Sequence, residues 1–229
     1  MSRKETFYFY LLLAIISLVP VSGSGQFQLG IKAGMNMGDI KVRSETLLVD
    51  EHYAPLRLWH FGMNGTFDLS KNISLQTDLL FNQKGGQSPV DLSMPNPLEA
   101  YWQYKMSYLS LPLLVQYNFG PLALEAGPEI GYLINMKVLR NDVLVENDLT
   151  FLGDQKIDFS ICVGFKFSVE QFFTEIRWVR SMLSIGDITF SDMNGAPLGH
   201  YHHYANTLQV SFGYYFLGNE KAEKITGIE

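Results

Sequence analysis

The segment "KIDFSICVGFKFSV", residues 156–169, alternates without interruption between apolar side chains and small or polar ones. Successive side chains of a β-strand point to opposite faces of a sheet, so the alternation predicts a strand with one apolar face. That face carries Ile157, Phe159, Ile161, Val163, Phe165, Phe167 and Val169. The opposite face carries Asp158, Ser160, Cys162, Gly164, Lys166 and Ser168. A face this uniformly apolar must lie against a protein core, a ligand or lipid.

The same alternation occurs eight times along the chain. It covers residues 26–37, 57–69, 73–84, 107–119, 122–134, 156–169, 172–180 and 206–216. Three connections are two or three residues long, and they alternate with four long ones: residues 38–55, 85–106, 135–155 and 182–204. This arrangement places every short turn at one end of an antiparallel sheet, which is typical of outer-membrane barrels. The sequence therefore predicts an all-β, eight-stranded antiparallel up-and-down transmembrane β-barrel.

The composition of the two faces indicates which one meets lipid. A soluble lipocalin-like barrel also has about eight strands, but it turns its apolar side chains inward. Here the polar faces carry charges of both signs, which can pair inside a narrow lumen: Lys32, Asp78, Lys84, Glu125, Glu129, Asp158, Lys166, Glu175 and Arg177. Aromatic residues gather near the short turns, as in an interfacial girdle: Phe27, Phe67, Tyr117, Phe119, Phe167, Phe172 and Phe216. We therefore expect outer-membrane lipid to surround the apolar faces.

The N-terminal residues 1–25 have the composition of a secretory signal peptide, with two basic residues, an apolar run and then small residues. The apolar run is about 13 residues long, which is short of the roughly 20 that a membrane-spanning helix needs. We expect the barrel to occupy residues 26–217. Residues 218–229 are then a polar C-terminal tail.

Charge and cysteine content exclude some functions. The formal net charge of −6 argues against a nucleic-acid partner. Cys162 is the only cysteine, so no disulfide can form within the chain. Its position on the polar face, between Ser160 and Gly164, suggests a small interior residue and not a catalytic thiol, because no base is evident beside it.

Two acidic residues lie on one strand face at a spacing that does not suit catalysis. Glu125 and Glu129 are four residues apart, which separates them by about 13 Å along a strand. This is too far for two carboxyl groups that share a proton or a glycosidic bond. We expect them to form interior ion pairs with Lys32, Lys166 or Arg177, because buried charges need partners.

The motif "GHYHHY" places His200, His202 and His203 in the last long connection. Zinc accepts imidazole nitrogens, but neighbouring histidines on an extended chain point in opposite directions and no fourth ligand is evident. The nucleophile motif GxSxG is absent. The sequence therefore predicts no catalytic residues, no metal ligands and no cofactor-binding residues.

Several segments together resemble the PorT-like outer-membrane β-barrel family. They are "GIKAGMNMGDI", "ISLQTDLLFNQKGG", "YLSLPLLVQYNFGPLALEAGPEIGYLI", "FFTEIRWVRSMLSIGDI" and "LQVSFGYYF", in this order along nearly the whole mature chain. The resemblance implies an eight-stranded barrel in the outer membrane of a Gram-negative bacterium. It also implies insertion by the barrel-assembly machinery and a link to a protein secretion system. It implies no functional residues.

The expected function is that of a non-enzymatic outer-membrane protein, with a scaffold or binding role exercised through long external loops that contact a protein partner. One alternative is an outer-membrane enzyme acting on lipid or lipopolysaccharide, to which loop residues could contribute: His52, Ser191, Asp192 and His200. A second alternative is a soluble lipocalin-like carrier. An eight-stranded barrel is too narrow to serve as a solute channel, because its own side chains fill it.

Overall fold

The computed structural model describes residues 27–44, 50–87, 101–146, 156–184, 186–191 and 197–218. The expected signal peptide lies outside these residues, and so does nearly all of the expected C-terminal tail. Within the described ranges, no helix is long and apolar enough to cross a bilayer.

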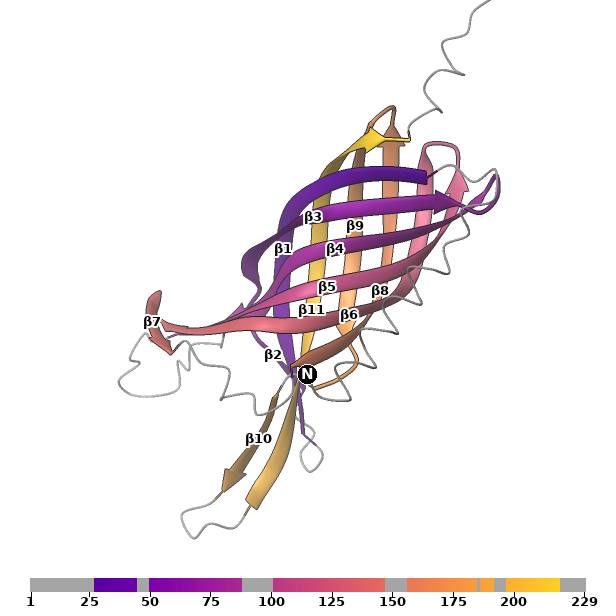
Figure 1. Cartoon of the computed structure of the whole chain (residues 1–229). Helices are drawn as coiled ribbons and strands as arrows, with labels where there is room; N and C mark the ends of the chain where they lie inside the picture. Colours follow the sequence, from indigo (N-terminus) through magenta and orange to yellow (C-terminus); the bar gives the residue numbers. More distant parts are fainter. Residues whose placement is uncertain are drawn as a thin grey trace, which may run out of the picture.

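Eight long antiparallel strands form a closed ring (Figure 1). They are β1 (Phe27–Ser44), β3 (Leu56–Asp68), β4 (Ile73–Gln87), β5 (Trp102–Phe119), β6 (Leu122–Arg140), β8 (Ile157–Val169), β9 (Phe172–Ser181) and β11 (Pro197–Leu217). Each strand pairs with the next, and β1 also pairs with β11, which closes the ring. Closure removes the open edges at which backbone groups would lack partners in hydrocarbon. The predicted eight-stranded barrel is confirmed.

Three short strands prolong the barrel at the end opposite the short turns (Figure 1). They are β2 (Asp50–His52), β7 (Val143–Glu146) and β10 (Gly186–Ser191), which pair with β1, β6 and β11 respectively. The sequence placed these residues in long loops, and that expectation is wrong for the parts nearest the barrel. The long strands β1, β6 and β11 extend beyond the sequence-predicted ends because each pairs there with one of these short strands.

The two faces of β8 are separated as the sequence predicted. Every odd-numbered residue from Ile157 to Val169 is exposed, and every even-numbered one from Asp158 to Lys166 is buried. Val163 is 45% exposed, whereas Cys162 beside it is fully buried. The other long strands show the same alternation, with large apolar side chains outside and polar ones inside. The apolar faces are therefore the exterior of the barrel, which is the surface that acyl chains cover.

The face assignment predicts opposite outcomes for the same charge placed outside or inside. Val163→Asp puts a carboxylate into acyl chains near the middle of β8, at a cost on the order of 2 kcal/mol. We expect it to reduce strongly the amount of folded barrel, measured as the boiling-dependent shift in gel mobility. Ser211→Asp is the matched control, because Ser211 faces inward and its hydroxyl lies 2.8 Å from the imidazole of His60. Equal loss of folded barrel in the two variants would contradict the assignment.

Candidate functional site

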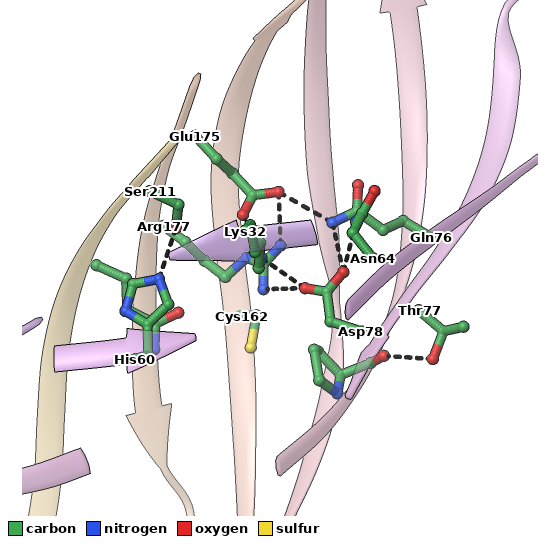
Figure 2. Close-up of polar contacts among 12 residues, drawn as sticks. Lys32, His60, Asn64, Gln76, Thr77, Asp78, Cys162, Glu175, Arg177 and Ser211 are labelled. Carbon is green, nitrogen blue, oxygen red and sulfur yellow. Dashed lines mark hydrogen bonds and ion pairs between the residues drawn. The ribbon is translucent and has the colours of Figure 1, made fainter. Parts of the chain in front are cut away.

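The middle of the lumen holds ion pairs between strands that are far apart in the sequence. Arg177 of β9 lies 2.8 Å from Glu125 of β6, 3.0 Å from Asp78 of β4 and 2.8 Å from Glu175 of its own strand. Lys32 of β1 lies 2.6 Å from Asp78 and 2.5 Å from Glu175. Figure 2 labels four of these side chains: Lys32, Asp78, Glu175 and Arg177. Each of the five is almost completely buried.

Lys166 of β8 adds a third positive charge to this group. Its ammonium donates hydrogen bonds to the Gln76 side-chain carbonyl, at 2.7 Å, and to the Tyr215 hydroxyl. It also lies 4.3 Å from the centre of the Phe173 ring, within reach of a cation–π interaction. We call Lys32, Lys166, Arg177, Asp78, Glu125 and Glu175 the central network. Its three cations and three carboxylates balance, which is what allows them to be buried.

A second group of charges lies nearer the long-loop end of the lumen. The Lys84 ammonium is 2.7 Å from Asp158, 2.9 Å from Glu129 and 3.0 Å from the Ser160 hydroxyl. The sequence predicted that Glu125 and Glu129 would pair with Lys32, Lys166 or Arg177. This is confirmed for Glu125, which pairs with Arg177. It is wrong for Glu129, which pairs with Lys84. Neighbouring strands of a barrel are shifted along one another by a fixed stagger. The alternation within one strand therefore does not predict which side chains of two different strands lie at the same level of the lumen.

The central network closes the barrel to solutes at its level. Strands β4 and β9 are four positions apart in the ring of eight and so lie on opposite walls. The contact between Asp78 and Arg177 therefore crosses the lumen. Cys162 also faces inward and is fully buried, with its sulfur 3.7 Å from Glu129. These positions agree with an interior filled by side chains.

The lumen changes from polar to apolar toward the long loops. A cluster of buried side chains occupies it there: Ile40, Met106, Tyr108, Leu133, Met136, Val138 and Ala205. Tyr53, Trp102 and Tyr104 are partly buried against it. We call this group the apolar rim cluster. Sequence reasoning missed it, although "DIKVR" and "MKVLR" show the signal: the alternation continues with the apolar residues inward.

The three histidines of the sequence motif lie on β11. The backbone N–H of His203 donates to the Ser184 hydroxyl at 3.2 Å, and the His203 ring meets Tyr53 edge-on at 6.3 Å. Among the residues that the structure describes, no group of three or more His, Cys, Asp or Glu side chains could hold a metal ion. The absence of a metal site stays a prediction for the whole chain.

The loop residues considered for an enzyme are divided between two strand pairs. Ser191 of β10 and His200 of β11 lie on one hairpin, where Ser191 pairs with Pro197 and His200 pairs with Thr189. His52 lies on β2, opposite Lys41 of β1. Asp192 lies outside the described residues. The backbone therefore brings Ser191 and His200 to the same hairpin and places His52 on another.

Comparisons with known proteins add a family match. The family model described as outer membrane protein beta-barrel domain matches residues 20–188. No curated protein matches the chain. Among solved structures, the chain is similar to Ail, the attachment invasion locus protein of Yersinia pestis, with 12% identity, a TM-score of 0.43 and coverage of 83% of this chain and 99% of that one. Neisserial surface protein A gives 7% identity, a TM-score of 0.43, and coverage of 85% and 100%. Outer membrane protein W of E. coli gives 13% identity, a TM-score of 0.34, and coverage of 86% and 100%.

Removal of the central cation should strongly destabilise the barrel. Arg177→Met leaves Glu125, Asp78 and Glu175 without one of their partners in a buried site. Breaking a buried ion pair from one side typically costs about 3–5 kcal/mol. We expect a decrease of this size in the free energy of unfolding, measured by urea titration in detergent micelles.

Two further variants control this experiment. Arg180→Met removes a positive charge from the same strand at an outward-facing position, and it should change the unfolding free energy little. Glu125→Gln in the Arg177→Met background removes one orphaned carboxylate and should restore part of the loss. An unchanged urea midpoint for Arg177→Met would show that the central network does not stabilise the barrel.

Proposed function

The chain belongs to the outer membrane protein beta-barrel domain family, and from this membership we propose that it is a non-enzymatic protein of scaffold or binding type, which acts through its long-loop end. It resides in the cell outer membrane. The alternative of a soluble lipocalin-like carrier is excluded, because such a barrel turns its apolar side chains inward. Here they face outward, and the lumen is filled by the central network.

The closed lumen is the observation that carries the proposal. Ion pairs between opposite walls leave no path for a solute through the centre of the barrel. Function then falls to the surfaces beyond the lipid, and binding residues are found disproportionately on loops held by a rigid scaffold. Short turns of such barrels face the periplasm and long loops face outward. The proposed binding surface is therefore external.

The hairpin of β6 and β7 is the best-defined part of that external surface. Its turn residues Asn141 and Asp142 have φ values of 50° and 63°, the left-handed backbone of a tight hairpin turn. Tyr101 holds the turn, because its hydroxyl donates to Asp142 at 2.5 Å and its backbone N–H donates to Asn141 at 3.1 Å. Val143 and Leu144 follow, with 67% and 52% exposure. A rigid hairpin that presents two apolar side chains suits a protein partner.

The finer proposal is a PorT-like protein that takes part in protein secretion and is inserted by the barrel-assembly machinery. The resemblance of the strand motifs supports the first part. The outward, exposed Phe216 near the end of β11 supports the second, because that machinery recognises an aromatic residue in the terminal strand.

A complementation experiment tests this function. A strain lacking the gene should show an altered profile of secreted proteins and an unaltered profile of lipid A and phospholipids. The wild-type gene should restore secretion. Val143→Asp combined with Leu144→Asp should not restore it, although the variant still shows the boiling-dependent gel shift of a folded barrel, because two charges replace the apolar contact.

The control variant is Lys71→Asp, which alters an exposed residue in a turn at the other end of the barrel. It should restore secretion fully. A deletion strain with normal secretion and altered lipid A would contradict the proposal and favour the lipid-modifying enzyme.

A further inference from the structure

The outer wall of the barrel carries a hollow near the long-loop end. Its volume is about 640 Å³, within the range of ligand sites. Most of its lining consists of outward-facing side chains from four neighbouring strands, among them Arg57 and Trp59 of β3, Phe81 of β4, Lys105 of β5, and Ile134 and Lys137 of β6. A hollow on this wall opens toward lipid and not toward the lumen.

Three positive charges gather in the hollow, and the side chains that the structure describes give them no negative partner. Lys105 and Lys137 lie directly opposite each other in the register of β5 and β6. Like charges in that position repel and destabilise a sheet. Across the β4–β5 ladder, Lys105 faces Gly85, which adds no side chain. Among the residues whose side chains the structure describes, no carboxylate forms an ion pair with either lysine or with Arg57, so the charge is uncompensated by that part of the protein.

The charged and apolar parts of the hollow are ordered along the barrel axis. Lys105 and Lys137 lie on the long-loop side, and Phe81 and Ile134 lie deeper in the wall, since each lysine is nearer the loop end of its own hairpin. Trp59 stacks on Phe81 at 5.1 Å between ring centres and forms a flat apolar floor. The order matches an amphiphile in the outer leaflet, with its headgroup toward the loops and its chains along the wall.

We propose that this hollow binds lipid A, the phosphorylated glycolipid of the outer leaflet. Arg57, Lys105 and Lys137 contact its phosphates, and Trp59 and Phe81 lie against its acyl chains. Three uncompensated cations call for more than one negative charge. Lipid A with its two phosphates supplies this, whereas a zwitterionic phospholipid has no net charge. The phosphates also remove the repulsion between the two lysines. The hollow adjoins the external hairpin of the proposed function, because Leu139 in its lining pairs with Leu144 of β7, but its three cations are not the side chains proposed to meet the protein partner.

Native mass spectrometry of the full barrel in detergent tests the site, with lipid A, phosphatidylglycerol and phosphatidylethanolamine added in turn. We expect one lipid A per barrel, bound at least tenfold more tightly than either phospholipid. Lys105→Gln combined with Lys137→Gln should weaken lipid A binding by about tenfold or more, because charge-assisted contacts to phosphate are lost. Lys71→Gln is the matched control, an exposed lysine at the opposite end, and it should bind like the wild type.

The folding of the double variant is checked in the same samples. With the repulsion between the lysines removed, its urea midpoint in lipid-free detergent should equal or exceed that of the wild type. Added lipid A should then raise the midpoint of the wild type and not that of the double variant. Equal lipid A affinity in the two proteins would overturn the site. Phosphatidylglycerol binding as tight as lipid A would overturn the assignment of the ligand and indicate a general contact of lysines with headgroups.

Discussion

Hydrocarbon offers no hydrogen-bond partners, and this constraint determines the rest of the structure. The chain satisfies its backbone groups by closing the sheet between β1 and β11, so no strand edge faces lipid. Closure with eight strands fixes a narrow lumen that side chains must fill. The exterior can then be apolar over the middle of the ladder, and the polar half of each alternation must find its partners inside.

The middle of the lumen meets that demand by balancing charge. The central network contains three cations and three carboxylates, and the contacts of Arg177 with Asp78 and Glu125 span strands that are not neighbours. Such pairs gain little net stability over an apolar filling, because both charges lose their water. They do fix which side chains meet across the lumen, which a uniformly apolar interior would leave less defined. Toward the long loops, the apolar rim cluster takes over from the charges.

Much of the fold follows from the alternation alone. The faces of β8 were assigned correctly at every residue from Ile157 to Lys166, because a period of two has only two possible orientations. The alternation also predicted the strand count and the closed ring. It could not predict that Glu129 meets Lys84, because that contact depends on the stagger between strands. The alternation also failed to predict the ends of the long strands near the long loops. There, polar residues such as Lys137 face outward and apolar residues face the lumen, which is the opposite of the pattern in the rest of the strand. The hollow around Lys105 could not be predicted from the sequence pattern of any one strand, because side chains from four strands form it.

The central network also bears on how the barrel is completed. Asp78 and Arg177 are 99 residues apart in the chain and on opposite walls. An unclosed sheet with five or six strands would expose carboxylates whose cations belong to strands not yet in place. Partial barrels therefore lack the contacts across the lumen that stabilise the finished one, and closure between β1 and β11 completes the hydrogen-bond ladder while it holds the opposite walls of the central network together. We therefore expect closure to be cooperative, because the hydrogen-bond ladder and the contacts across the lumen form together.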